Sequence, residues 1–363
     1  MEHDLFEESV ALLQSLIAVP SFSNEEELAA DIWETWLREK GVKVNRFHNN
    51  VYALSENFDS SKPILLLNSH IDTVKPVATY TRDPFEPAIT EGRLYGLGSN
   101  DAGGAGVSLA SVFLNLLKRT DLSLNLLLAL TASEERMGEW GMRAFLPHLK
   151  ASGIYPQMAI VGEPTGCKAA IAERGLVVCD AEVMGKAGHA ARNEGINAIY
   201  RACDDIDKIR NLEWPKESET LGNIKVTVSM INAGTQHNIV PDKCNYVVDI
   251  RTTDAFSNEE TVKFLQGATT WSKLTPRSTR IRASVLPLSH PLAQAAKDTG
   301  LETFVSPTTS DMALMYDIPS IKIGPGESKR SHSADEFIEL QEINQGIRVY
   351  ENLISHLKIP YND

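Results

Sequence analysis

Residues 122–135 read LSLNLLLALTASEE, a leucine-rich run that ends in two adjacent glutamates. A short, almost uninterrupted apolar run is typical of a strand that is buried on both faces of a parallel sheet. Side chains of successive residues in an extended chain point in opposite directions. Glu134 and Glu135 could therefore do different jobs at the end of this strand, or they could simply face water in a loop.

Strand and helix patterns alternate around this run. Residues 63–70 (PILLLNSH) and 157–164 (QMAIVGEP) predict two more buried strands, and residues 105–119 and 141–150 predict helices. This alternation predicts an α/β domain with a mixed, largely parallel sheet that is flanked by helices on both faces.

Two amphipathic helices are expected ahead of the first strand. The second of them, near residues 24–40, starts with Ser23 and Glu26 at the spacing of a capping box. In that motif each side chain bonds to the backbone N–H group of the other residue. The helix is expected to stop at Gly41.

The middle of the chain has a different order of elements. Its pattern is β-α-β-β-α-β, which predicts an inserted ferredoxin-like α+β domain over residues 175–285. The strands are expected at 176–185, 224–234, 243–253 and 279–285, and the helices at 196–210 and from Ser257 onwards. Residues 1–174 and 286–363 are then expected to form the outer, first domain together.

Composition excludes several classes of protein. The chain has 363 residues and a net charge of −13, which argues against nucleic acid as a partner. It has no apolar run long enough to cross a membrane, and its acidic N-terminus does not resemble a signal peptide. The four cysteines are scattered, which favours reduced thiols and a cytoplasmic protein.

Polar side chains gather where the predicted strands end. The carboxyl ends of parallel strands meet at one edge of the sheet, so these side chains should lie together. Without cations the carboxylates among them would repel one another. Two imidazoles and three carboxylates suit zinc, cobalt or manganese, and five ligands fit two ions if one carboxylate bridges them. The five residues are His70, Asp101, Glu135, Glu163 and His332.

Eight motifs make the chain resemble the zinc aminoacylase and carboxypeptidase (M20-type) family of metallohydrolases. They occur in family order, and the last is the segment that contains His332. Within the family the chain most resembles the acetylornithine deacetylases and the succinyl-diaminopimelate desuccinylases. The motifs are SHIDTV, GSNDAGG, SEE, GEPTG, GKAGHAA, NIVPDKCNYVVDIR, TSDM and GPGESKRSHSADE.

The resemblance implies a role for each metal ligand. Asp101 would bridge two divalent ions, which in this family are zinc or, as a substitute, cobalt. His70 and Glu163 would complete the protein ligands of one ion, and Glu135 and His332 those of the other.

Further roles follow from the same resemblance. Glu134 would be the general base, and Asp72 would orient His70. His189 would stabilise the oxyanion, often across a homodimer that forms through the inserted lid domain. Asn238 and Arg251 would hold a substrate carboxylate, and Gly326, with Gly324, would contact substrate through the backbone.

The implied activity is hydrolysis of a small N-acyl amino acid by a water held between the two metals. N-acetyl- or N-succinyl-ornithine is the expected substrate, in arginine biosynthesis. The alternatives are succinyl-diaminopimelate and the substrates of related dipeptidases and aminoacylases. A succinyl group would need a cation, which Lys329, Arg330 or Arg192 could supply.

Two other classes of protein compete with this interpretation. The segment GLGSNDAGG is similar to a dinucleotide-binding turn, but Asp101 stands at the third glycine position, where it would repel a pyrophosphate. A non-catalytic metal-binding protein would have no use for Glu134 next to Glu135.

Overall fold

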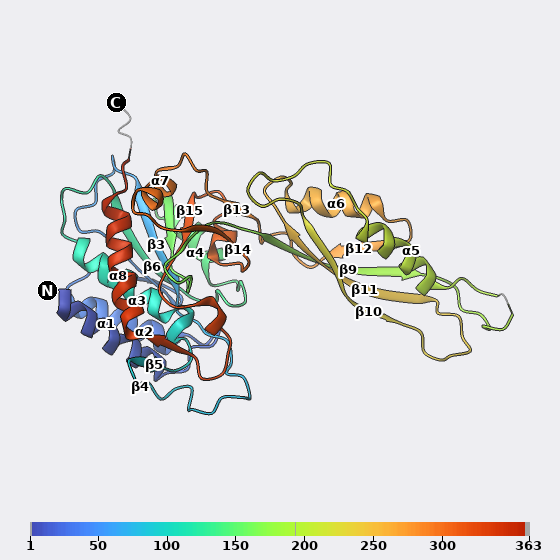
Figure 1. Cartoon of the computed structure of the whole chain (residues 1–363), viewed down its shortest axis with the longest axis horizontal. Coiled ribbons are helices and arrows are strands. Elements are labelled where there is room, and N and C mark those ends of the chain that lie inside the picture. Colours follow the sequence, from blue (N-terminus) through green and yellow to red (C-terminus); the bar gives the residue numbers. More distant parts are fainter. Residues whose placement is uncertain (1, 193, 360–363) are drawn as a thin grey trace. The chain divides into compact units, whose positions relative to one another are not determined.

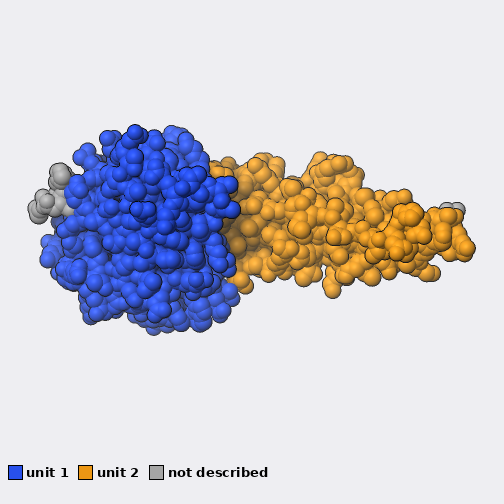
Figure 2. Space-filling view, turned by 90° about the horizontal axis from the view of Figure 1, so that it is seen from below, with its two compact units in different colours: residues 1–171, 286–304, 310–363 blue, residues 172–285, 305–309 orange. Residues whose placement is uncertain are grey.

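The computed structural model describes residues 2–192 and 194–359. These residues form two compact units, which have different colours in Figure 2. Unit 1 comprises Met1–Ile171, Leu286–Phe304 and Ser310–Asp363, and unit 2 comprises Ala172–Val285 and Val305–Thr309. Unit 1 thus joins both ends of the chain, and unit 2 is built mainly from its middle. No helix in the described ranges is both long and apolar enough to cross a bilayer.

A mixed sheet forms the centre of unit 1 (Figure 1). The four neighbouring strands β6, β3, β7 and β15 are parallel, and the strands outside them pair antiparallel. The expected mixed, largely parallel sheet is confirmed. In spatial order the strands are β1 (Asn45–Phe47), β2 (Asn50–Leu54), β6 (Asn125–Thr131), β3 (Ile64–His70), β7 (Pro156–Val161), β15 (Ser320–Lys322) and β8 (Ala169–Glu173).

Helices cover both faces of this sheet. Alternate residues of each central strand point to opposite faces, so each face packs against its own hydrophobic core. Leu65 and Leu67 of β3 belong to the larger core, while Ile64 and Leu66 belong to the smaller one. The larger core is covered by α1 (Glu2–Ile17), α2 (Glu27–Glu39), α3 (Gly104–Leu116), α7 (Pro291–Asp298) and α8 (Leu340–Ser355). The smaller core is covered by α4 (Met142–Ala151) and the short helix η2 (Asp311–Leu314).

Several short elements complete the fold. A second sheet has the order β16-β5-β4, and the short helices η1 and η3 lie in loops of unit 1. The short strand β13 pairs with the end of β8. The bounds are β4 (Ala88–Thr90), β5 (Arg93–Tyr95), β16 (Phe337–Glu339), η1 (Ser99–Gly103), η3 (Ser328–Arg330), β13 (Ser284–Val285) and β14 (Thr303–Ser306).

The predicted capping box at the start of α2 is wrong. Glu26 is the N-cap residue, but no side chain caps the helix. The Ser23 hydroxyl instead donates a 2.6 Å hydrogen bond to Asp72, and the Glu26 carboxylate accepts hydrogen bonds from Ser133. Both side chains are engaged by distant segments and are not available to the helix. The end of the helix is as expected, because Gly41 follows it with a φ of +81°.

Unit 2 has the ferredoxin-like order of elements. Its four-stranded antiparallel sheet is arranged β10-β11-β9-β12, with α5 and α6 joining the strands. The core of this unit is separate from those of unit 1. In chain order the elements are β9 (Gly175–Met184), α5 (Ala198–Arg210), β10 (Lys225–Ala233), β11 (Lys243–Thr252), α6 (Asn258–Ala268) and β12 (Ser272–Pro276).

The last strand of unit 2 lies earlier than predicted. It is β12, whereas residues 279–285 contribute an isolated bridge at Ile281 and the two-residue strand β13. Only Ser272 and Leu274 of β12 point into the core. Two buried residues are too few for the period of a strand to be recognised in the sequence. The longer alternation of TRIRASV resembles a strand more closely, and this explains the wrong prediction.

Candidate metal centre

The predicted metal ligands of unit 1 lie where the central strands end. His70 is the last residue of β3, Glu135 follows the end of β6, and Glu163 lies just beyond β7. These three strands are parallel neighbours, so their carboxyl ends meet at the same edge of the sheet. Asp101 lies in η1, immediately before α3, and His332 follows η3. The fold therefore brings these five side chains together from distant parts of the chain.

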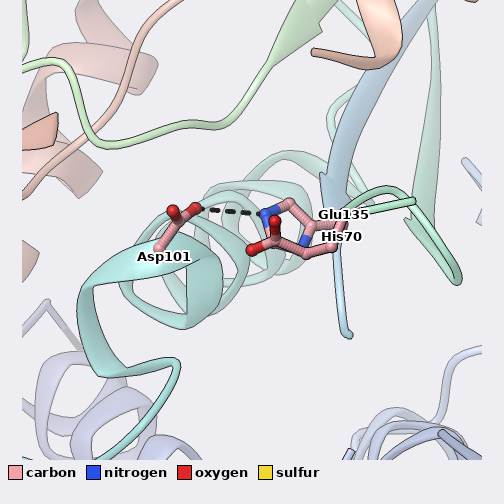
Figure 3. Close-up of side chains that lie close together, drawn as sticks. All are labelled: His70, Asp101 and Glu135. Carbon is pink, nitrogen blue, oxygen red and sulfur yellow. Dashed lines mark hydrogen bonds and ion pairs between the residues drawn. The ribbon is translucent and has the colours of Figure 1, made fainter. Parts of the chain in front are cut away.

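Asp101 lies between the two histidines. Its Oδ1 is 3.3 Å from Nε2 of His70, and its Oδ2 is 3.6 Å from Nε2 of His332 (Figure 3 shows the first of these contacts). Glu135 lies 3.0 Å from Nε2 of His332, and Glu163 lies 3.9 Å from Nε2 of His70. The two oxygens of one carboxylate thus face two separate imidazole nitrogens, each with a further carboxylate beside it.

The electrostatics of this cluster favour added positive charge. Burial, together with the negative charge of Asp101, raises the pKa of Glu163 to about 8. Its hydrogen bond to Glu135 raises the pKa of His332 to about 9. Burial raises the pKa of the Glu134 carboxyl well above its usual value, and neighbouring carboxylates add to this shift. A group of buried acids with two imidazoles fits a pair of divalent cations, which would offset the repulsion among the carboxylates.

The donor atoms form two overlapping groups of the size that a metal ion needs. One group contains His70, Asp101 and Glu135, and the other contains His70, Glu134 and Glu163; within each group the ligand atoms lie within 4.8 Å of one another. Oxygen and imidazole donors suit zinc, cobalt or manganese. The residues present therefore fit the expected metals.

Asp72 contacts His70 mainly through its backbone. Nδ1 of His70 lies 2.9 Å from the backbone oxygen of Asp72, and 3.6 Å from its carboxylate. This arrangement places the Nδ1 proton on the backbone side and leaves the lone pair of Nε2 for the cluster. The Asp72 carboxylate instead accepts the backbone N–H groups of Glu134, at 2.9 Å, and Glu135, at 3.2 Å.

Sequence reasoning gave no role to several other buried acids of this region, and two of them accept backbone N–H groups beside the predicted ligands. Glu336 accepts the N–H groups of Asn100 and Asp101 at 2.9 Å each, and that of Gly98 at 3.1 Å. Glu26 holds Ser133 in the same way. Glu336 ends the motif GPGESKRSHSADE, which also contains His332, so that motif is the signal that could have found it. Glu26 lies ahead of the predicted strands, where the signal of the metal ligands is absent. The spacing of Ser23 to Glu26 is typical of a helix cap, and it therefore hides the bonds that both side chains make to distant segments.

Three predicted substrate residues lie in unit 2. His189 and Asn238 are exposed and lie on neighbouring segments, because His189 forms a bridge with Ile239. Arg251 lies on β11, where both ends of its guanidinium group donate to Asp249 at 2.8 and 3.1 Å. Their roles toward a substrate stay predictions.

The predicted glycine loop lies in unit 1. Gly326 has a φ of +85°, and a Cβ atom there would come within 2.4 Å of Asn100. Its carbonyl oxygen accepts the N–H group of Gly166 at 2.6 Å. The position requires glycine for reasons of conformation and space, and its contact with substrate stays a prediction.

A sequence model of the peptidase family M20/M25/M40 matches residues 66–356. The chain belongs to this family. The expected family and its metal-dependent hydrolase chemistry are thereby confirmed. Membership of this family argues against the alternative of a dinucleotide-binding protein.

Curated relatives of this M20/M25/M40 chain include two kinds of deacylase. The succinyl-diaminopimelate desuccinylase of Wolbachia pipientis wMel is 25% identical, over 97% of this chain and 94% of that protein. The acetylornithine deacetylase of Edwardsiella ictaluri is 26% identical, over 96% of this chain and 97% of that protein. Relatives at this distance support the family's chemistry and leave the substrate open.

Solved structures agree on the fold. Aminopeptidase PepT from Bacillus cereus has a TM-score of 0.76 at 18% identity and covers 98% of this chain and 99% of its own. The YXEP protein of Bacillus subtilis, described as a dinuclear metal binding peptidase, has a TM-score of 0.72 at 15% identity, with 98% and 99% covered.

Proposed function

We propose that this hydrolase removes the acyl group from N-acyl-L-ornithine, with two metal ions held by His70, Asp101, Glu135, Glu163 and His332. The observation that carries the two-metal chemistry is the position of Asp101, whose two oxygens face two different histidines, while the acetylornithine deacetylase among the relatives supports the choice of ornithine. We infer Zn²⁺ as the metal and Co²⁺ as its substitute, because the donors are nitrogen and oxygen atoms. The ions, when bound, lower the pKa of a water molecule and polarise the acyl carbonyl.

The residues of the chain perform the proton transfers. Glu134 takes a proton from the attacking water as the water adds to the acyl carbon, and then gives this proton to the nitrogen as the C–N bond breaks. His189 stabilises the negative oxygen of the tetrahedral intermediate. Arg251 and Asn238 hold the carboxylate of the amino acid, a task for which the planar fork of arginine is suited. Arg251 then exchanges its hydrogen bonds to Asp249 for bonds to the substrate.

The acyl group could be acetyl or succinyl, and a succinyl carboxylate would need a cation beside it. Arg330 donates two hydrogen bonds to Glu342, at 2.6 and 3.1 Å, and its guanidinium carbon lies 4.5 Å from the centre of the Phe337 ring. Arg330 would have to give up these contacts to bind a succinyl carboxylate, so it is the least favoured of the three cations. Lys329 and Arg192 remain the candidates for a succinyl carboxylate.

Steady-state kinetics test the substrate. The metal-loaded protein should hydrolyse N-acetyl- or N-succinyl-ornithine with a higher kcat/KM than succinyl-diaminopimelate or a dipeptide. Equal values on all four substrates would contradict the choice of ornithine. Bound metal without turnover of any N-acyl amino acid would favour the metal-binding protein over the enzyme.

Assembly and location are part of the same proposal. We infer a homodimer through unit 2, because β10 is an edge strand with exposed Met230 and Ile231. Sedimentation of the protein should give twice the mass of one chain, and a monomer would contradict the dimer. A cytoplasmic location fits the four free cysteines. The proposed substrate places the enzyme in arginine biosynthesis, and growth of a deletion strain without added arginine would contradict that role.

A further inference from the structure

The turn that carries Glu134 and Glu135 has an unusual backbone. Ser133 has a φ of +56°, in the left-handed region that residues other than glycine seldom adopt. The turn is closed by hydrogen bonds from the Gly138 N–H group to the oxygen of Ser133, at 2.8 Å, and from the Met137 N–H group to that of Glu134, at 2.7 Å. A conformation of this kind persists only where surrounding groups hold it.

Glu26 is one of those groups. Its side chain is 1% exposed, and its Oε1 accepts the N–H group of Ser133 at 3.0 Å and the Ser133 hydroxyl at 2.9 Å. The same oxygen accepts the N–H group of Asn24 at 2.6 Å, while Oε2 accepts Nδ2 of Asn49 at 3.0 Å. A buried carboxylate is thus committed to a residue 107 positions away in the chain.

Asp72 continues this pattern along the turn. It accepts the next two N–H groups, those of Glu134 and Glu135. It is itself held by the hydroxyl of Ser23, which lies just ahead of Glu26 in the segment before α2. The backbone N–H groups of Ser133, Glu134 and Glu135 therefore all donate to the buried carboxylates of Glu26 and Asp72. The segment Ser23–Glu26 supports the turn directly through Glu26 and indirectly through the bond of Ser23 to Asp72.

We propose that Glu26 is a positioning residue for catalysis, because it holds Ser133 in the conformation that aims Glu134 at the substrate side of the cluster. This inference rests on the proposed role of Glu134 as general base. The role needs an acceptor oxygen at Oε1 and does not need a negative charge. Glutamine can supply that oxygen, but its amide nitrogen replaces Oε2 and faces Nδ2 of Asn49, so the Asn49 amide has to turn over to accept from it. Methionine fills a similar volume without an acceptor oxygen.

Kinetics of matched variants test the proposal. Glu26→Met should lower kcat at least tenfold with KM within twofold and both metals retained, since a displacement of about 1 Å can cost about 100-fold in rate. Glu26→Gln should stay within threefold of the wild-type kcat. Glu25→Met is the control, because Glu25 is the exposed neighbouring glutamate, and it should behave as wild type.

Hydrogen exchange gives a readout that does not depend on turnover. The amides of residues 133–135 should exchange faster in Glu26→Met than in wild type, and at the wild-type rate in Glu26→Gln. If Glu26→Met does not fold, Ser133→Ala, which removes the hydroxyl bonds to Glu26 and Asn24 and keeps the N–H bond to Glu26, should show the same pattern in a milder form. Wild-type kcat and wild-type exchange in the folded variant would overturn the inference, as would a loss of metals in parallel with kcat.

The result also separates this inference from the proposed function. If Glu134→Gln retains turnover, the general-base assignment fails. Exchange at Ser133 then still shows whether Glu26 holds the turn. If Glu134→Gln is inactive while Glu26→Met keeps full kcat, only the positioning role of Glu26 is wrong.

Discussion

At the scale of single residues, the two adjacent glutamates Glu134 and Glu135 have different proposed roles. Glu135 lies 3.0 Å from His332 and groups with His70 and Asp101, whereas Glu134 groups with His70 and Glu163. Glu134→Gln should keep both metals and lose about 100- to 10,000-fold in kcat, because a general base contributes that much. Glu135→Gln should lose metal, because a ligand is removed. Elemental analysis of the purified variants, measured beside kcat, checks both results; a metal-free Glu134→Gln would contradict the division of roles.

Several of the proposed metal ligands carry a local sequence signal. His70 ends an apolar strand and Glu163 follows another, so the parallel sheet alone places them at one edge. Glu26 carries no such signal, since its partner Ser133 comes from another part of the fold. Its local spacing to Ser23 matched a helix cap, and tertiary hydrogen bonds took precedence. Supporting residues of this kind become visible only when the fold is known.

Whole elements also depend on single buried acids, as α5 and β12 show. Asp205 of α5 is fully buried and accepts the N–H groups of Thr270, Trp271 and Ser272 at 2.7–2.8 Å. These contacts fix where β12 begins, 67 residues further along the chain, so the sequence pattern could not place that strand. The α-helices and longer strands, by contrast, follow from periodicity alone.

Asp205→Ala should therefore destabilise unit 2 by about 2–4 kcal/mol, because it leaves buried N–H groups without an acceptor. Asp204→Ala, at an exposed neighbour, is the control. Although burial opposes ionisation, the hydrogen bonds lower the pKa of Asp205. Ionised Asp205 thus contributes to the free energy of unfolding at pH values above its unfolded pKa of about 4. This contribution is lost as the pH falls through the lower pKa of Asp205 in the folded protein. Urea unfolding at pH 7 and pH 3 checks this; an equal loss at both pH values would contradict it.

At the scale of the whole molecule, the metal centre belongs to one unit. All five predicted ligands lie in unit 1, and each unit has a hydrophobic core of its own. Metal binds only the folded state, so at 1,000 times its Kd it should stabilise unit 1 by about 4 kcal/mol. Removal of metal also restores the repulsion among buried carboxylates, whose pKa values are raised in its absence.

Treatment with a chelator should consequently lower the stability of unit 1 and leave that of unit 2 unchanged. Hydrogen exchange resolved by segment is the appropriate measurement, since it reads β3 and β6 separately from β9 and β11. Added Zn²⁺ should restore the protection of β3 and β6, because the ligands at their ends regain their cation. A matching loss of protection in β9 and β11 would show that the two units unfold together, and unchanged protection everywhere would show that the cluster binds no metal.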